Sequence, residues 1–134
     1  MNREEPFELP LTVRGYEMDA FGHVNNAVYV QYFEHCRWMA FQQLGGDWLG
    51  AAPGIVVRKL TVEYDAAARV FDDLVVRLWV ESIGTTSVTF GQDLRDADSD
   101  ERVAAAEVVT VCVDAAGKPQ PVPDKWKEAF GFED

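Results

Sequence analysis

The sequence is poor in cysteine, histidine and basic residues, and each shortage excludes a class of protein. Only two cysteines occur among the 134 residues, Cys36 and Cys112, and both lie in apolar stretches. Two such thiols are too few for a disulfide framework, so we expect them to be free and buried in a reducing compartment. The two histidines and two cysteines lack any metal-ligand spacing. No metal site is therefore expected.

Basic residues are outnumbered, with 12 Lys and Arg against 23 Asp and Glu and a formal net charge of -11. A surface of this sign repels nucleic acids and anionic membranes, and no basic stripe offsets it. No apolar run is long enough to cross a bilayer, and the first residues lack the apolar segment of a signal peptide. We therefore predict a cytoplasmic protein with neither a nucleic acid nor a membrane as its partner.

The chain shows no internal repeat and no linker rich in proline, glycine or serine. With 48% hydrophobic residues, it can bury a core without disulfides. We predict a single domain over residues 1–134. The pattern predicts a strand at 7–14, an irregular loop at 15–25, a helix at 26–44, and strands at 55–65, 74–83, 86–95 and 102–114. A short helical turn is expected around Trp126 and Phe130.

The predicted helix carries a broad apolar stripe and has clear signals at both ends. Asn25 or Asn26 can cap its start, and Gly45-Gly46 is a typical stop. The stripe consists of Tyr29, Val30, Phe33, Cys36, the stem of Arg37, Ala40, Phe41 and Leu44. A helix that is apolar over most of its circumference has to be covered by another layer.

The predicted strands are long, rich in β-branched residues and joined by short turns, which favours an antiparallel meander. Pro10 indicates that the first strand lies at an edge or contains a bulge. The last strand is apolar on both faces, as expected of a central strand. The fold class is therefore α+β, with one long helix across the concave face of an antiparallel sheet of about five strands. The other sheet face is apolar enough to predict a homo-oligomer.

Polar residues and glycine are concentrated just before the helix, and this segment can support catalysis. The start of a helix presents unpaired N–H groups and a partial positive charge, which together stabilise an oxyanion. Asp19 precedes that start, and Gly22 allows the backbone to turn back sharply. An anion at this place is favoured, so we expect Asp19 to be ionised and suited to act as a base or a nucleophile. The alternative is that Asp19, Asn25 and Asn26 serve only as caps and solvated loop residues.

The stretch from Asp19 to Phe33 (DAFGHVNNAVYVQYF) resembles the signature of the 4-hydroxybenzoyl-CoA thioesterase-like hotdog family. It is most similar to the branch of short bacterial acyl-CoA thioesterases. The His-Val-Asn-Asn core, residues 23–26, also looks like that of acyl-acyl-carrier-protein thioesterases. The resemblance implies a hotdog fold, in which the sheet wraps around the helix. It also implies a homodimer or homotetramer with active sites at the dimer interface, and an acyl-CoA substrate.

By the same resemblance, Asp19 is the catalytic carboxylate, and the backbone N–H of Asn26 polarises the thioester carbonyl. Coenzyme A arrives as part of the substrate, and no separate cofactor is needed. Gly22, His23, Val24 and Asn25 are expected to contact the substrate. Tyr29 and Phe33 are expected to line the acyl pocket.

Four further residues have two interpretations each. His23 either contacts the substrate or braces the loop, and Glu34 either lines the pocket or lies on a solvated helix face. Arg58 and Lys59 either hold the phosphates of coenzyme A or are charges of a sheet edge that keep the protein soluble. Other functions also remain: hydrolysis of acyl groups from a carrier protein, binding of acyl-CoA without turnover, and a hotdog dehydratase or hydratase that uses His23.

Overall fold

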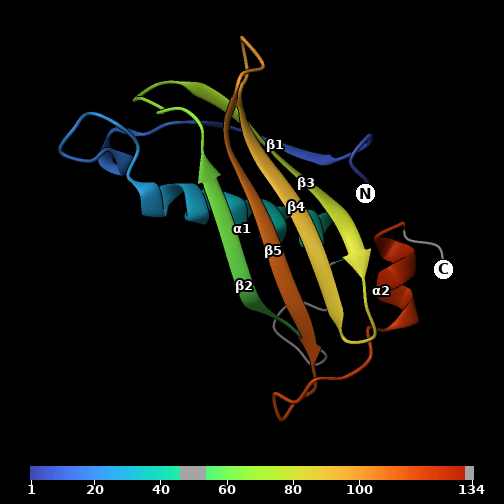
Figure 1. Ribbon diagram of the computed structural model, residues 1–134. Coiled ribbons are helices and arrows are strands. Elements are labelled where there is room, and N and C mark those ends of the chain that lie inside the picture. The colour runs from blue at the N-terminus through green and yellow to red at the C-terminus, as the bar shows by residue number, and fades with distance from the viewer. Residues whose placement is uncertain (46–53, 132–134) are drawn as a thin grey trace.

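The computed structural model describes residues 1–45 and 54–131 (Figure 1). Its elements, in chain order, are β1 (Phe7–Thr12), the short 3-10 helix η1 (Gly15–Glu17), α1 (Asn26–Gln43), β2 (Gly54–Tyr64), β3 (Asp73–Ile83), β4 (Ser87–Asp96), β5 (Arg102–Val113) and α2 (Asp124–Ala129). The predicted long helix and four later strands are confirmed, each within two residues of the expected ends. The short final helix at Trp126 is also confirmed.

The five strands form one antiparallel sheet in the order β1-β3-β4-β5-β2. The predicted meander is confirmed for β3, β4 and β5, whereas β2 pairs with β5 at the far edge instead of lying beside β3. β1 occupies the other edge, where it pairs with β3. Pro10 lies opposite Val75 in that pairing. An edge strand tolerates proline because the missing N–H leaves no ladder partner unpaired on the open side.

The helix α1 crosses one face of the sheet, as Figure 1 shows. Asn25 caps its start, and Gly45, with a φ of 122°, follows its end. The other glycine of the predicted stop, Gly46, lies outside the described residues. The buried side chains of α1 are Tyr29, Tyr32, Phe33, Cys36, Arg37, Ala40 and Phe41. Those on the inner face of the sheet include Leu74, Val76, Leu78, Val80, Val88, Phe90, Leu94, Ala104, Ala106, Val108 and Cys112.

A polar contact lies within this core and joins α1 to β4. The sequence predicts burial of only the stem of Arg37, yet the whole side chain is buried, and its Nη1 donates to Gln92 Oε1 at 2.9 Å. The amide nitrogen of Gln92 in turn donates to the Phe33 carbonyl at 3.0 Å. Burial lowers the pKa of Arg37, while the charge of Glu34 partly opposes this. These two hydrogen bonds pair the polar groups of Arg37 and Gln92 inside the core, and they fix the position of α1 along β4.

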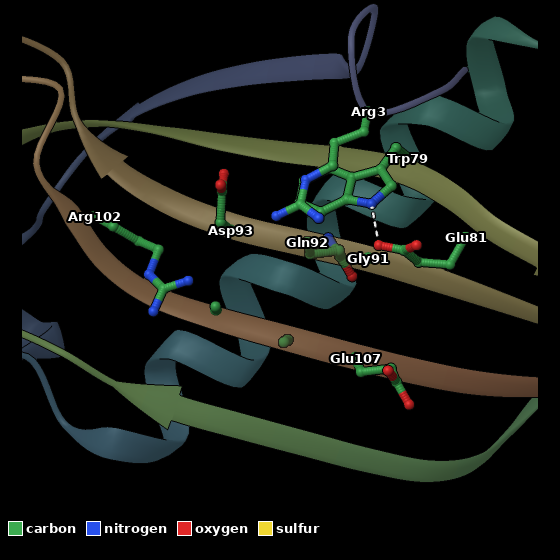
Figure 2. Close-up of a pocket in the computed structure, with 10 residues that line it drawn as sticks. Arg3, Trp79, Glu81, Gly91, Gln92, Asp93, Arg102 and Glu107 are labelled. Carbon is green, nitrogen blue, oxygen red and sulfur yellow. Dashed lines mark hydrogen bonds between the residues drawn. The ribbon is translucent and has the colours of Figure 1, made fainter.

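The outer face of the sheet is covered in part by a tryptophan. Trp79 is buried, and its indole N–H donates to Glu81 at 2.6 Å (Figure 2). The guanidinium of Arg3 lies 5.2 Å from the ring centre, and that of Arg77 lies 5.6 Å from it. Gly91 leaves the space that the indole fills, since a Cβ there would collide with the ring. The apolar outer face predicted from the sequence is thus largely shielded at this position within a single chain.

Candidate active site

The start of α1 leaves one backbone donor open. The Asn25 side chain accepts from the Ala27 N–H at 2.9 Å, and the Asn25 carbonyl accepts from the Val28 N–H at 2.9 Å. Among the described residues, no acceptor lies against the N–H of Asn26, which is exposed. A free amide in the first turn of a helix is a suitable donor to an oxyanion, because it can donate without breaking another hydrogen bond.

Asp19 begins a tight turn that leads to this helix. Its Oδ1 accepts from the N–H groups of Phe21 and His23, at 2.8 and 3.2 Å, and its own N–H donates to the His23 carbonyl at 2.7 Å. Gly22, with a φ of 79°, supplies the left-handed residue that the turn needs. A bridge between Met18 and Val24 closes the turn. Within the described part of the chain, the second oxygen of the carboxylate has no hydrogen-bond partner and is available to a substrate.

The turn also determines the charge of Asp19. The hydrogen bond from the His23 amide, followed by that from the Phe21 amide, holds the pKa of Asp19 below its ordinary value. The imidazole of His23 adds a smaller effect in the same direction. The group is partly exposed and ionised at neutral pH, as predicted, but amides of its own turn contribute most. The observed contacts of His23 fit the interpretation that it braces the loop.

The end of β2 and the segment that follows it pack against the turn and the helix start. The Tyr64 hydroxyl donates to the Asn26 carbonyl at 3.1 Å, and its ring meets the edge of Tyr29 at 5.3 Å between centres. Ala68 is bound on both sides: its N–H donates to the Tyr29 hydroxyl at 3.0 Å, and its carbonyl accepts from the Val24 N–H at 2.9 Å. Four contacts therefore join two segments that lie about 40 residues apart in the chain.

A second buried cluster supports the same turn from the side of β1. The Glu17 carboxylate accepts from the Tyr32 hydroxyl at 2.9 Å and from the backbone and side chain of Arg14 at 2.8 and 3.3 Å. The Glu17 carbonyl accepts from the Asn25 N–H at 2.9 Å. Burial, together with the bond to Glu17, raises the pKa of Tyr32, so its hydroxyl stays a neutral donor. Glu17 thus links the turn, the N-cap and the helix.

Two surface hollows are present elsewhere on the described residues, and the larger one shares Glu17 and Tyr32 with the cluster just described. One, of about 580 Å³, lies between β1 and α1 and is lined in part by Leu9, Leu11, Tyr32 and His35. The other, of about 140 Å³, lies on the outer face of the sheet beside Trp79 (Figure 2). Neither contains Asp19 or Asn26, so within the described part of one chain these hollows do not enclose the candidate site.

The structure brings together most of the predicted site residues. Those in the turn or the first turn of α1 are Asp19, Gly22, His23, Val24, Asn25, Asn26 and Tyr29. Phe33 is fully buried in the core, and Val24 and Tyr29 are nearly so, which leaves almost no surface of these three side chains open to an acyl chain in a single chain. Glu34 is exposed on the helix.

Arg58 and Lys59 are exposed on β2, and the register of that strand shifts between Val57 and Lys59. Lys59 is five residues from Tyr64, the residue of β2 that bonds to Asn26. It therefore lies about 17 Å along the strand from the helix start.

Three residues of the site were not identified from the sequence: Glu17, Tyr64 and Ala68. Nothing in the pattern connects Tyr64 or Ala68 with the helix start, because their contacts depend on the path of the chain between α1 and β3. Glu17, two residues before Asp19, lies between Tyr16 and Met18 in the sequence. An acidic residue next to apolar ones is only a weak indication that its side chain is buried. Tyr32 also lacked an assigned role, although its spacing of three from Tyr29 fits a shared helix face.

Two kinds of feature are not found among the described residues. No group of three or more His, Cys, Asp or Glu side chains in residues 1–45 and 54–131 is arranged to hold a metal ion. None of the described helices is long and apolar enough to span a membrane.

Comparisons with known proteins agree on one family. A family model for the Thioesterase-like superfamily matches residues 13–130. YbgC of Escherichia coli O6:H1, named as an acyl-CoA thioester hydrolase, is 36% identical over 121 residues, which is 87% of this chain and 90% of that protein. The chloroplastic acyl-acyl carrier protein thioesterase ATL2 of Arabidopsis thaliana is 29% identical over 127 residues, which is 92% of this chain and 68% of that protein. A thioesterase from Thermus thermophilus, solved with coenzyme A and Zn, is 28% identical with a TM-score of 0.83, over 92% of this chain and 90% of that one.

Proposed function

The chain belongs to the Thioesterase-like superfamily, and on this premise we propose that it hydrolyses acyl-CoA thioesters to the free acid and coenzyme A. The hotdog fold predicted from the sequence is confirmed by this membership and by the position of α1 on the five-stranded sheet. The observation that carries the proposal is the pairing, within residues 19–26, of an ionised carboxylate with an unpaired helix amide.

The chemistry follows from what each of these groups offers. The thioester carbonyl oxygen accepts from the Asn26 N–H, which withdraws electrons from the carbonyl carbon. Asp19 then either removes a proton from a water molecule that attacks this carbon, or attacks it directly and forms an anhydride that water cleaves. In both routes the C–S bond breaks, the sulfur takes up a proton, and the acyl group leaves as a carboxylate. Both routes need the free oxygen of Asp19 and the free amide of Asn26.

Acyl-CoA is preferred over an acylated carrier protein because of charge. A carrier with an acidic surface would meet a chain whose formal net charge is -11. Coenzyme A is also anionic, but its phosphates are confined to one end, where a few cations such as Arg58 and Lys59 suffice. The relative from Escherichia coli acts on acyl-CoA by its name, and the one from Arabidopsis acts on acyl carrier protein by its name. Hydrolysis of acyl-carrier thioesters is therefore the second candidate.

The proposal includes the setting expected from the sequence. The enzyme is proposed to act in the cytoplasm as a homodimer or homotetramer, without a metal or a bound cofactor. A partner subunit completes the substrate pocket, which is consistent with the open position of Asp19 in a single chain. Gly22, His23, Asn25 and Asn26 face the acyl and pantetheine groups in this arrangement.

The test is thiol release from a panel of short, long and aromatic acyl-CoA substrates, with wild type beside Asp19→Asn. Asparagine keeps an oxygen that accepts from the Phe21 and His23 amides, so the turn is retained and only the charge is lost. We expect kcat to fall by about a hundredfold to ten-thousandfold, the usual contribution of a general base.

Asp96→Asn is the matched control. Asp96 Oδ1 accepts from the Asp98 and Ser99 amides at 2.9 Å in each case, and these bonds lower its pKa as the corresponding bonds do for Asp19. This control should retain wild-type turnover. Equal activity of Asp19→Asn and wild type would remove the catalytic assignment. Binding of acyl-CoA without turnover by wild type would identify a non-catalytic binder, and faster turnover of the same acyl group on a carrier protein would favour the second candidate.

A further inference from the structure

We propose that Tyr64 is a positioning residue of the thioesterase reaction, holding the first residue of α1 so that the Asn26 N–H points at the substrate carbonyl. This inference rests on the proposed function, because it concerns the oxyanion donor of that reaction. Its basis is the hydrogen bond of 3.1 Å from the Tyr64 hydroxyl to the Asn26 carbonyl, made across a separation of 38 residues.

Asn26 is the first residue of α1, so the helix continues from it in one direction only. The peptide group after it is fixed at two points, since its carbonyl accepts from Tyr64 and its N–H, that of Ala27, donates to the Asn25 side chain. A peptide plane held at both its oxygen and its nitrogen cannot rotate freely. The Asn26 N–H belongs to the preceding peptide and, among the described residues, has no acceptor. The carbonyl of that preceding peptide, from Asn25, accepts from the Val28 N–H at 2.9 Å. With the peptides on both sides of Asn26 held, the donor is oriented without being occupied.

Helix ends fray unless something outside the helix holds them. The Asn26 carbonyl has two lone pairs, so the Tyr64 hydroxyl can bond to it in addition to a helical N–H. A donor aimed at an oxyanion is effective only if it is fixed before the reaction begins, since reorganisation during the reaction costs rate. An external bond at this residue supplies that rigidity.

The position of Tyr64 is itself determined by its neighbours. It ends β2, where it pairs with Ala104 of β5, and its ring meets the edge of Tyr29. Tyr29 is held in turn by the N–H of Ala68. The hydroxyl therefore extends from a sheet-anchored strand to the helix start. Tyr64 is 48% exposed, and Asn26 is exposed as well. Removing the Tyr64 hydroxyl therefore leaves the Asn26 carbonyl open to water and creates no buried, unpaired polar atom.

Tyr64→Phe removes the hydroxyl and keeps the ring contact with Tyr29. We expect kcat to fall by about tenfold, which is less than the roughly hundredfold to thousandfold loss for removal of an oxyanion donor. KM should change by less than about twofold, since the lost effect is specific to the transition state. The backbone amide signals of Asn26 and Ala27 in ¹H–¹⁵N NMR should shift, and their exchange with solvent should accelerate. Tyr16→Phe is the control: Tyr16 is exposed and lies beside Arg14, and its loss should alter neither the kinetics nor these amide signals.

Three outcomes would overturn the inference. An unchanged kcat in an active enzyme shows that Tyr64 does not matter for the donor. A reduced kcat with unmoved Asn26 and Ala27 signals shows that Tyr64 acts in another way, for example on the substrate. If wild type hydrolyses no thioester, the proposed function fails separately, and the NMR comparison alone decides whether Tyr64 fixes Asn26: unmoved signals reject the restraint.

Discussion

The carboxylate of Asp19 is held as an anion by two amides of its own turn, and this determines how the enzyme should respond to acid. A group with a lowered pKa keeps its charge until the pH falls below the ordinary value for an aspartate, about 3.9. Its contribution to stability has the same sign: it is present at neutral pH and is lost only as the pH falls through the lowered pKa. The amides of Phe21 and His23 therefore extend the working range of the base towards acid.

We predict that kcat/KM stays level from neutral pH down to about 4.5 and declines only below it, because Asp19 is then still ionised. The measurement is the initial rate of acyl-CoA hydrolysis across this range, with circular dichroism at each pH to verify that the protein is folded. An acid limb with an apparent pKa above about 5 would mean that Asp19 is not the group that titrates, or that its turn opens in solution.

At the scale of elements, the buried contact between α1 and β4 should be sensitive to substitution, because it pairs a charged group with an amide inside the core. Gln92→Leu leaves the Arg37 guanidinium buried without its side-chain acceptor. Removing one partner from a buried charged group costs about 3 kcal/mol of unfolding free energy. Arg37→Met removes the charge, and the double variant replaces the whole contact with apolar groups of similar size.

We predict that the double variant is more stable than the sum of the two single losses indicates, by at least about 1 kcal/mol. Urea denaturation of the four proteins gives the coupling energy. Simple additivity would show that the Arg37–Gln92 hydrogen bond contributes nothing beyond its separate side chains.

The elements themselves were predictable, whereas some of their neighbours were not. Apolar side chains repeat at every second position in β3 and β4, as Val76, Leu78 and Val80 show, so the inner faces of these strands follow from the sequence. The same pattern does not reveal that Gln92 is in this buried row, since a glutamine is usually exposed. Asp19 and Asn26 could be paired in advance because they lie in one continuous segment. The contact between Tyr64 and Asn26 could not, because it requires knowing that β2 runs along the far edge of the sheet.

At the scale of the whole molecule, β2 presents both an open strand edge and exposed apolar side chains. Val57 is 50% exposed and Leu60 is 38% exposed on this edge strand. Unprotected edges of this kind pair with other chains unless they are covered. The predicted homo-oligomer thus has a candidate contact surface, composed of Val56, Val57, Leu60 and Tyr64.

We predict that the protein sediments as a dimer or a larger assembly and that Val57→Lys weakens this association by about tenfold or more, because a charge replaces an apolar contact. Val70→Lys is the control, since Val70 is an exposed valine outside β2. Analytical ultracentrifugation over a range of concentrations measures both variants. A monomeric wild type at micromolar concentration, or equal weakening by both substitutions, would contradict this role of β2.

The two thiols of the chain are hidden, and this makes the protein convenient to assay. Burial raises the pKa of Cys36 to about 12 and also raises that of Cys112, so neither sulfur is a thiolate at neutral pH. A chromogenic disulfide reagent added to the native enzyme should therefore report only the coenzyme A set free by turnover, with no slow background from the protein. The same reagent in denaturant should titrate two equivalents per chain. One colour reaction thus follows catalysis when the protein is folded and counts unfolded chains when it is not.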